Sequence, residues 1–473
     1  MKRFIFTAVL IAFAVLSFFP AIKASAVNTS PAVTNNEDHW NYWTWHNWSQ
    51  VVNSYLYDNG SGITRVEYTG SCVTVESYDS ANHFINAKSI TCELPLFGGF
   101  FCGSEYNYLV FGQSNPNEND NVEVIRTVKY SKDWQRLGHA SIYGANTTIP
   151  FDAGSLRMDE SGAYLFVRTC HEMYAYNGVN HQANLTYTVN TNIMEVVDIF
   201  SIIWNIDGGY VSHSFNQFIK ADGNKLIALD HGDAHPRSAA LIRYNSGICD
   251  STLQSGCNYV NTVSYPGTAG DNTTNACVGG FELTSKGYMT AGNSNILTSG
   301  TQRNIYITIT DRNNFSSGGT KITWLTHYSN SGNITLSNPQ LVKVNDDKLL
   351  VIWKENSVVK YVFVDGSGNI ISDTVSDSSL KLSDCLPIVT GNRAVWYVTS
   401  NSTPVFYSIK VSDEGIPGDA NGDGSVNMDD ALLTMRFSMG IVNSIYPYAD
   451  IDGNGTIDSA DALQILRFAI GIV

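Results

Sequence analysis

The chain has 473 residues, of which 43% are hydrophobic and 15% charged, and its formal net charge at pH 7 is −15. This length and hydrophobic content predict a globular protein with one large domain or several smaller ones. The acidic balance argues against nucleic acid and against an anionic membrane surface as partners.

The first 26 residues have the pattern of a secretory leader. Lys2 and Arg3 precede an apolar run at 4–20, and an A-x-A site at 24–26 predicts cleavage before Val27. No later stretch is long and apolar enough to span a bilayer. We therefore expect a signal peptide at 1–26 and a soluble protein that is secreted to the extracellular space.

Four tryptophans follow within a short segment, at Trp40, Trp43, Trp45 and Trp48. Their flat faces could stack on sugar rings. Such a cluster more often belongs to a hydrophobic core, where aromatic side chains bury large areas. Both interpretations stay open.

Residues 27–410 are rich in Tyr, Thr, Val, Asn and Gly and lack long helical periodicity, which predicts β-structure. A turn followed by an apolar-aromatic run recurs about every 45 to 64 residues. Its copies start at Tyr106, Ser161, Asp222, Lys286, Asp346 and Gly391, after a first set of strands at 55–77. This repetition is typical of a β-propeller. We predict about seven blades, with six or eight blades and a pair of β-sandwiches as alternatives.

A dense polar cluster follows one of these runs and consists of Asp230, His231, Asp233, His235 and Arg237. The two carboxyl groups could share acid and base roles in glycoside cleavage. A histidine could instead abstract a proton while Arg237 holds a uronic carboxylate, as a lyase requires. The structural alternative is a turn between strands, in which Asp230 accepts backbone amides and Arg237 pairs with an aspartate.

The preceding repeat carries a weaker version of this cluster. His171 and Glu172 follow its apolar run, and aligning the repeats places them near 230–235 at one mouth of the propeller. The body as a whole resembles uncharacterised secreted bacterial β-propeller proteins, a resemblance that implies no activity.

Eight cysteines are present, and none forms a C-x-x-C pair, which makes zinc or redox chemistry an unlikely expectation. Export permits disulfides, and the short intervals Cys92/Cys102 and Cys249/Cys257 would suit bridged loops. Free thiols remain the alternative.

Two twelve-residue segments near the C-terminus place oxygen side chains at positions 1, 3, 5, 9 and 12, with glycine at position 6 and a residue at position 7 that can offer its carbonyl. The first copy supplies Asp419, Asn421, Asp423, Ser425, Asn427 and Asp430, and the second, 31 residues later (450 against 419), supplies Asp450, Asp452, Asn454, Thr456, Asp458 and Asp461. Each copy precedes an amphipathic helix that ends before a glycine. The pattern predicts two bound Ca²⁺ ions.

Two such loop-and-helix units, with Asp in place of Glu at position 12, resemble a dockerin, an α-helical module with EF-hand-like calcium loops. The resemblance covers 418–473, and 411–417 is the expected linker. It implies docking to a cohesin module of a scaffold protein. The partner-binding positions it implies are Met428, Asp429 and Arg436 in the first half and Ser459, Ala460 and Arg467 in the second.

These features together predict a secreted cellulosome subunit whose propeller acts in plant polysaccharide degradation, as a glycoside hydrolase or a lyase. The alternative is a non-catalytic carbohydrate-binding or adhesion subunit of the same complex. A peptidase or a peptidase inhibitor is a third possibility, because fold alone does not choose among activities.

Overall fold

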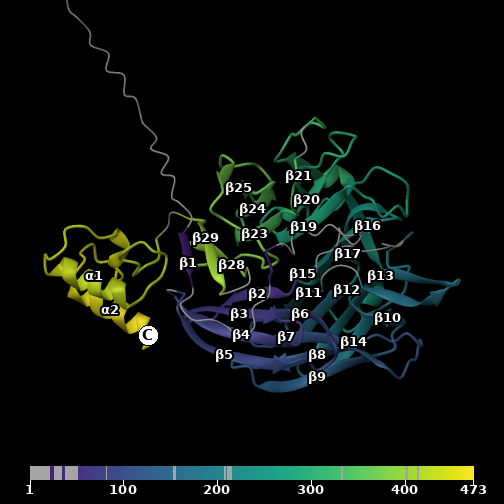
Figure 1. Ribbon diagram of the computed structural model, residues 1–473, viewed down its shortest axis with the longest axis horizontal. Coiled ribbons are helices and arrows are strands. Elements are labelled where there is room, and N and C mark those ends of the chain that lie inside the picture. The colour runs from purple at the N-terminus through teal and green to yellow at the C-terminus, as the bar shows by residue number, and fades with distance from the viewer. Residues whose placement is uncertain are drawn as a thin grey trace, which may run out of the picture.

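The computed structural model describes residues 22–25, 35–37, 52–80, 82–152, 156–206, 209, 216–331, 334–399, 403–412 and 415–472. Over these residues, seven antiparallel sheets surround a common axis, and a two-helix module follows at the C-terminal end (Figure 1). The fold is a seven-bladed β-propeller with an appended helical module. The predicted fold class and blade number are confirmed.

The first three blades are formed by consecutive strands. Blade 1 consists of β2 (Ser54–Asp58), β3 (Gly62–Tyr68), β4 (Cys72–Asp79) and β5 (Phe84–Thr91). Blade 2 consists of β6 (Leu96–Cys102), β7 (Asn107–Gly112), β8 (Glu123–Tyr130) and β9 (Arg136–Tyr143). Blade 3 has five strands, β10 (Thr147–Ile149), β11 (Arg157–Ser161), β12 (Tyr164–Tyr176), β13 (Val179–Asn190) and β14 (Glu195–Phe200).

Three further blades follow the same order. Blade 4 consists of β15 (Gln217–Asp222), β16 (Lys225–Asp233), β17 (Arg237–Tyr244) and β18 (Cys257–Ser264). Blade 5 consists of β19 (Ala276–Leu283), β20 (Gly287–Ser294), β21 (Asn304–Asp311) and β22 (Thr320–Trp324). Blade 6 consists of β23 (Gln340–Asn345), β24 (Lys348–Glu355), β25 (Val358–Asp365) and β26 (Val375–Asp377).

Blade 7 joins the two ends of the propeller. Its strands are β27 (Ile388–Thr390), β28 (Arg393–Val398), β29 (Val405–Lys410) and, as the outer strand, β1 (Ile22–Ser25). β1 pairs antiparallel with β29, with Ile22 opposite Ser408 and Ser25 opposite Val405. Because β1 lies inside the expected leader at 1–26, the ring is closed by residues that signal cleavage would remove. The leader boundary itself stays a prediction.

The inner strand of each blade lies nearest the axis and packs against inner strands of neighbouring blades, and in every blade except blade 3 it is the first strand of the blade. In blade 3 this inner strand is β11, which pairs with β12. Tight turns lead from the inner strand to the second strand, and Gly162 and Gly223 have φ of 58° in two of these turns. Residues with a side chain rarely adopt this conformation, so glycine defines these corners.

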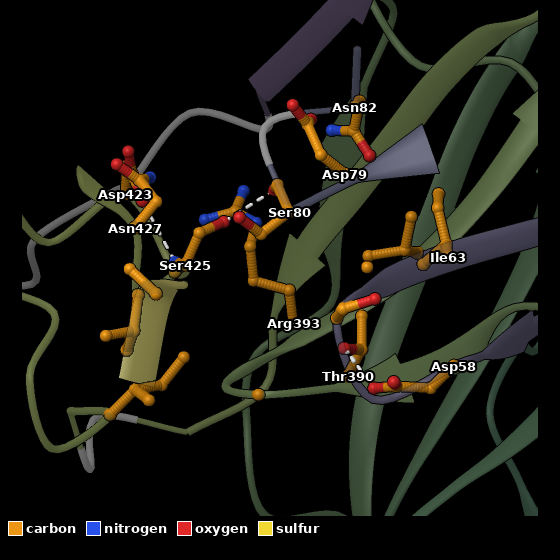
Figure 2. A pocket seen from close by; sticks show the side chains of 18 of the residues that line it. Asp58, Ile63, Asp79, Ser80, Asn82, Thr390, Arg393, Asp423, Ser425 and Asn427 are labelled. Atoms are coloured by element: carbon orange, nitrogen blue, oxygen red, sulfur yellow. Dashed lines mark hydrogen bonds between the residues drawn. The ribbon is translucent and has the colours of Figure 1, made fainter. Parts of the chain in front are cut away.

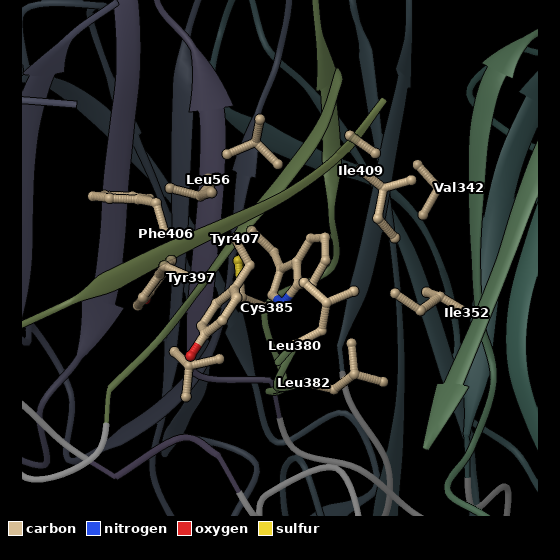
Figure 3. Packing of buried hydrophobic residues seen from close by; sticks show 14 of the residues in the cluster. Leu56, Val342, Ile352, Leu380, Leu382, Cys385, Tyr397, Phe406, Tyr407 and Ile409 are labelled. Atoms are coloured by element: carbon tan, nitrogen blue, oxygen red, sulfur yellow. The ribbon is translucent and has the colours of Figure 1, made fainter. Parts of the chain in front are cut away.

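Hydrophobic side chains fill the spaces between adjacent blades. Around blade 7, Tyr397, Phe406 and Tyr407 pack with Ile352 of blade 6 and Leu56 of blade 1 (Figure 3). Each blade therefore buries its two faces only against its neighbours, as expected for a propeller.

The helical module contains α1 (Met428–Ser438) and α2 (Ser459–Ala469), with one 3₁₀ turn at Pro447–Ala449. Both helices begin with a reciprocal capping box, formed by Asn427 with Asp430 and by Asp458 with Asp461. Two further 3₁₀ turns, at Thr252–Ser255 and Ser317–Gly319, belong to the propeller. None of the helices in the described ranges has the length and hydropathy required to cross a bilayer.

Candidate functional site

The five residues predicted for catalysis lie at the end of β16 and around the turn to β17. Asp230 is fully buried, and its carboxylate accepts hydrogen bonds from Arg168 Nε at 2.9 Å, from Arg168 Nη2 and from Asn184 Nδ2 at 2.7 Å. Arg168 and Asn184 belong to blade 3. Asp230 therefore joins blades 3 and 4, which supports the structural alternative for this residue.

His231 is also fully buried, next to this ion pair in the chain. Its Nε2 lies 2.9 Å from Thr274 Oγ1, and its ring packs against the edge of Tyr265 at 5.1 Å between centroids. Burial lowers the pKa of His231 to about 3, and the charges of Arg303 and Arg237 act in the same direction. The imidazole is therefore neutral at pH 7 and enclosed by protein.

Arg237 organises a loop. It donates to the backbone carbonyl oxygens of Pro266 at 2.9 Å, Asp233 at 3.1 Å, Asp271 at 2.5 Å and Thr273 at 2.9 Å. Asp233 is buried, whereas His235 is exposed. The guanidinium is thus committed to main-chain acceptors, and a catalytic role for the five residues stays a prediction.

The corresponding residues of blade 3 are also enclosed. His171 is fully buried, its Nδ1 lies 2.8 Å from Thr147 Oγ1, and burial lowers its pKa to about 3. Glu172 accepts a hydrogen bond from Thr148 Oγ1 at 2.7 Å. The blade 3 side chains that reach Asp230 are Arg168 and Asn184, and the sequence alone predicted neither as its partner.

The inner strands enclose a cavity of about 420 Å³ on the propeller axis. Charged side chains line it, among them Arg157 of β11, Lys220 of β15 and Glu282 of β19, together with several aromatic rings. The sequence alone did not indicate this cavity, because its lining is assembled from one to five residues of each of seven inner strands that are far apart in the chain.

The first acidic loop of the helical module is arranged around two aspartates. The carboxylate of Asp419 accepts hydrogen bonds from the backbone N–H groups of Gly422, Asp423 and Gly424, at 2.7–3.1 Å. The carboxylate of Asp430 accepts from Ala420, Asn421 and Asn427, at 2.8–3.1 Å. The loop at 419–430 is thereby folded around the carboxylates of Asp419 and Asp430, which point into it.

The second loop repeats this arrangement. Asp461 accepts hydrogen bonds from the N–H groups of Ile451, Asp452 and Asp458. One carboxylate oxygen from each of Asp450, Asp452 and Asp461 lies within 4.8 Å of the others. Three carboxylates at this spacing suit a hard cation such as Ca²⁺, which prefers oxygen ligands.

Electrostatics supports the same fit. Burial raises the pKa of Asp430 to about 6, and the charges of Asp423 and Asp419 act in the same direction. Burial also raises the pKa of Asp419. A divalent cation would offset both the burial and the mutual repulsion of these groups. The ligand set of both loops therefore fits calcium.

Residues 417–468 match the family model described as the dockerin type I domain. The C-terminal module is a type I dockerin. Dockerins of this type bind calcium and dock their chain onto a cohesin in a cellulosome. The family thus provides the calcium chemistry and the class of partner for the C-terminal 52 or so residues, and it leaves the propeller unassigned.

No curated protein matches the chain. Among solved structures, a prolyl endopeptidase is 10% identical with a TM-score of 0.42, covering 76% of this chain and 49% of that chain. The Pan2 WD40 domain of Neurospora crassa is 9% identical with a TM-score of 0.40, covering 76% and 92%. A putative 6-phosphogluconolactonase from Bacteroides fragilis is 12% identical with a TM-score of 0.36, covering 71% and 96%. This chain spans about half the length of that endopeptidase, and none of these likenesses bears on activity.

The six partner-binding positions expected from the resemblance are all exposed on the dockerin. Apolar side chains lie exposed around them, including Met428, Leu432 and Met439 in the first half and Leu463 and Phe468 in the second. An exposed apolar surface of this kind is typical of a protein interaction site. The geometry is consistent with docking through the outer faces of α1 and α2.

The first half of the dockerin also contacts the propeller. Ser425 Oγ donates to the carbonyl oxygen of Ser80 at 2.7 Å, and both residues line a cavity of about 840 Å³ between the two parts (Figure 2). Met428 and Asp429 also line this cavity. Arg393 of blade 7 lies on the propeller side of this cavity. Burial lowers the pKa of Arg393, and Asp423 and Asp419 oppose that shift. The first calcium loop therefore faces the propeller.

The linker is held at the same place. Val411 N donates to the carbonyl oxygen of Asn392 at 2.8 Å. Gly391 has φ of 55°, a conformation that residues with a side chain rarely adopt, and a Cβ there would lie 2.4 Å from Ile416 Cδ1 of the linker, so Ile416 would have to shift.

The expectations for the cysteines and for the tryptophan cluster have different outcomes. None of the eight cysteines forms a disulfide, so the bridges suggested for Cys92/Cys102 and Cys249/Cys257 are absent. Cys92 precedes β6 and Cys102 ends it, and about 3.3 Å per strand residue separates them far beyond the roughly 7 Å limit between bridged Cα atoms. The tryptophans at 40–48 lie outside the described residues.

Proposed function

We propose that this protein is an exported cellulosome subunit whose propeller binds plant cell-wall polysaccharide. The dockerin carries the proposal, because a cohesin-docked chain is delivered to the substrate of its scaffold. We propose that each of the two loops binds one Ca²⁺, supported by the inward-facing carboxylates of Asp419 and Asp430 and by the group of Asp450, Asp452 and Asp461. The propeller then provides the carbohydrate-recognising part.

Binding is preferred to cleavage at the blade 4 turn on physical grounds. A general acid or base must reach the proton that it transfers. Asp230 and His231 are fully buried, Arg168 and Asn184 donate to the carboxylate of Asp230, and Thr274 contacts Nε2 of His231. Substrate therefore has no direct access to either group in this conformation.

Polysaccharide cleavage in the axial cavity is a second candidate. Glu282 lines this cavity and pairs with Lys220 at 3.2 Å. Asp159 of β11 lies beside that pair and is not part of the cavity lining. Burial raises the pKa of Asp159, the charge of Lys220 lowers it, and the charge of Glu282 raises it. Two carboxyl groups in different environments are the pattern that acid and base roles require.

One panel of measurements separates these candidates. The full chain is first captured on an immobilised cohesin with and without calcium, which tests docking. It is then incubated with insoluble plant cell wall and with soluble wall polysaccharides. Retention on the wall without reducing sugar or an unsaturated product supports binding. Release of either product supports cleavage, and neither retention nor product contradicts the carbohydrate role.

A further inference from the structure

The axial cavity has the size and composition of a small-ligand site. Its volume of about 420 Å³ falls in the range of about 300–1,000 Å³ found for ligand pockets. The rings of Tyr55, Phe100, Phe218 and Phe281 line it. Aromatic faces of this kind pack against the C–H face of a sugar ring, which combines an apolar face with a polar rim.

The charges in this cavity are mostly compensated. Lys220 Nζ lies 3.2 Å from a carboxylate oxygen of Glu282, so these two groups form an ion pair. The buried carboxylate of Asp384 accepts a hydrogen bond from the N–H of Asn53 at 2.8 Å. Their charges therefore have local partners.

Arg157 differs from these groups. Within the described residues it makes no ion pair, and its one hydrogen bond is a long contact of Nη1 to the carbonyl oxygen of Leu156 at 3.5 Å. Its guanidinium carbon lies 4.9 Å from the ring centroid of Phe218. Asp384 is close enough to act on its charge but forms no ion pair with it.

A guanidinium in this setting is suited to a carboxylate. It presents five N–H donors in a planar fork that matches the two oxygens of a carboxylate. Burial lowers the pKa of Arg157 to about 10, and the charge of Asp384 opposes this shift only in part. An incoming anion would relieve this burial penalty, whereas a neutral ligand would not.

We propose that the axial cavity binds the carboxylate of a hexuronate, with Arg157 as the anchor and the aromatic lining against the sugar ring. This inference rests on the proposed carbohydrate role of the propeller and names the acidic sugars as its ligand class. A hexuronate carries both a carboxylate for Arg157 and hydroxyl groups for the polar atoms of the cavity.

Arg157 lies towards the end of the propeller that faces away from the dockerin. Arg157 is the first residue of β11, whereas the dockerin packs against the turn that follows β27. In every blade the inner strand, which is β11 in blade 3, leads through a turn into the second strand, so the inner strands run in the same direction along the axis. The mouth nearest Arg157 therefore lies at the opposite end of the ring from the dockerin, where a scaffold-bound chain stays accessible.

Calorimetric titration of the full chain with D-galacturonate, D-galactose and acetate tests the proposal. We expect galacturonate to bind the parent and Arg136→Gln, which removes an exposed arginine on the outer strand β9. Arg157→Gln should weaken galacturonate binding at least tenfold. Arg157→Lys keeps the charge without the fork and should weaken it several-fold, and it serves as the test variant if Arg157→Gln lowers the melting temperature.

Four outcomes overturn the inference. Galacturonate binding that is equal in the parent and the Arg157 variants removes the anchor. If galactose binds as tightly as galacturonate, the site does not recognise the carboxylate. If acetate binds as tightly as galacturonate, the site does not recognise the sugar ring. Retention of the same preparation on plant cell wall, without galacturonate binding, overturns the inference and leaves the proposed function standing.

Discussion

Arg168 of blade 3 and Asp230 of blade 4 form a buried ion pair that joins two blades of the ring. Both side chains are almost completely inaccessible, at 2% and 0% relative exposure. Removing one partner leaves the other charge buried and uncompensated, which costs about 3–5 kcal/mol. Asp230→Ala should therefore lower the unfolding free energy of the propeller by that amount, measured by urea denaturation.

The matched control is the more exposed pair of Arg312 with Asp222 at 2.7 Å. Arg312→Gln should cost about 1 kcal/mol or less, because solvent screens this pair. Replacing Arg168 and Asp230 together by apolar residues should restore part of the loss. An Asp230→Ala protein as stable as the parent would show that the pair does not hold the blades together.

Acid should destabilise the propeller through His171 and His231. Burial lowers the pKa of both to about 3, against about 6.5 in an unfolded chain. Between these pH values the unfolded chain binds more protons than the folded chain. The stabilisation that the two neutral histidines give the folded propeller is therefore complete above about pH 6.5 and is lost as the pH falls towards 3. Each histidine can contribute a slope of up to about 1.4 kcal/mol per pH unit.

The measurement is the unfolding free energy of the propeller at several pH values between 7 and 4. The double variant with His171→Gln and His231→Gln should show a shallower pH dependence than the parent. His83→Gln, at an exposed turn, is the control and should match the parent. Identical slopes for the double variant and the parent would contradict the assignment.

Chelation should unfold the dockerin and leave the propeller folded. The carboxylates of each loop repel one another without a cation, so metal binding and folding of the module are coupled. Calorimetry with calcium should show two transitions, and EGTA should remove the one that belongs to the dockerin. At saturating calcium and without EGTA, Asp430→Ala and Asp461→Ala should also remove the dockerin transition. Asp429→Ala changes an exposed residue outside the ligand set and should leave that transition in place. A single transition insensitive to chelator would refute this coupling.

Cohesin should dock in one dominant orientation. The resemblance assigns partner choice to Met428 and Asp429 in one half and to Ser459 and Ala460 in the other. Met428 and Asp429 line the cavity shared with the propeller, so the end with Ser459 and Ala460 is the more open one. We expect substitution of Ser459 and Ala460 by charged residues to weaken cohesin binding at least tenfold, since a mismatched buried charge costs several kcal/mol.

The control is the double variant with Met428→Ala and Asp429→Ala. Its affinity for cohesin, measured by surface plasmon resonance, should differ little from that of the parent. A variant changed in both halves should fail to bind. If each single-half variant binds as tightly as the parent and only the combined variant fails, the two orientations are equivalent and the asymmetry is wrong.

The blade number could be predicted because the second strand of each blade is buried on both faces. The apolar runs that start after Tyr106, Asp222 and Lys286 correspond to β7, β16 and β20, which are buried along nearly their whole length. The inner strands show a weaker hydrophobic pattern in the sequence. They mix apolar residues with polar ones that face the cavity, such as Lys220 and Glu282, and therefore lack a clear period.

The candidate site could be predicted only in part. The expected calcium ligands follow a fixed spacing within each loop, so they can be predicted from the sequence alone, and their identity stays a prediction. The partner of Asp230 lies 62 residues away, in the preceding repeat, and only the stacking of blades brings Arg168 to it. Arg157 is equally hidden, because its role depends on seven inner strands that converge from the whole length of the propeller.

Closure of the ring through β1 makes leader removal a structural event. Cleavage before Val27 would separate Ile22–Ser25 from the body and leave the backbone N–H and C=O groups of β29 along one edge of blade 7 without that partner. An open edge strand is a template for strand addition by another segment or another chain. The exported protein would then carry, beside its dockerin, a second place at which a peptide can be incorporated, and the position of the leader cut would decide whether that place exists.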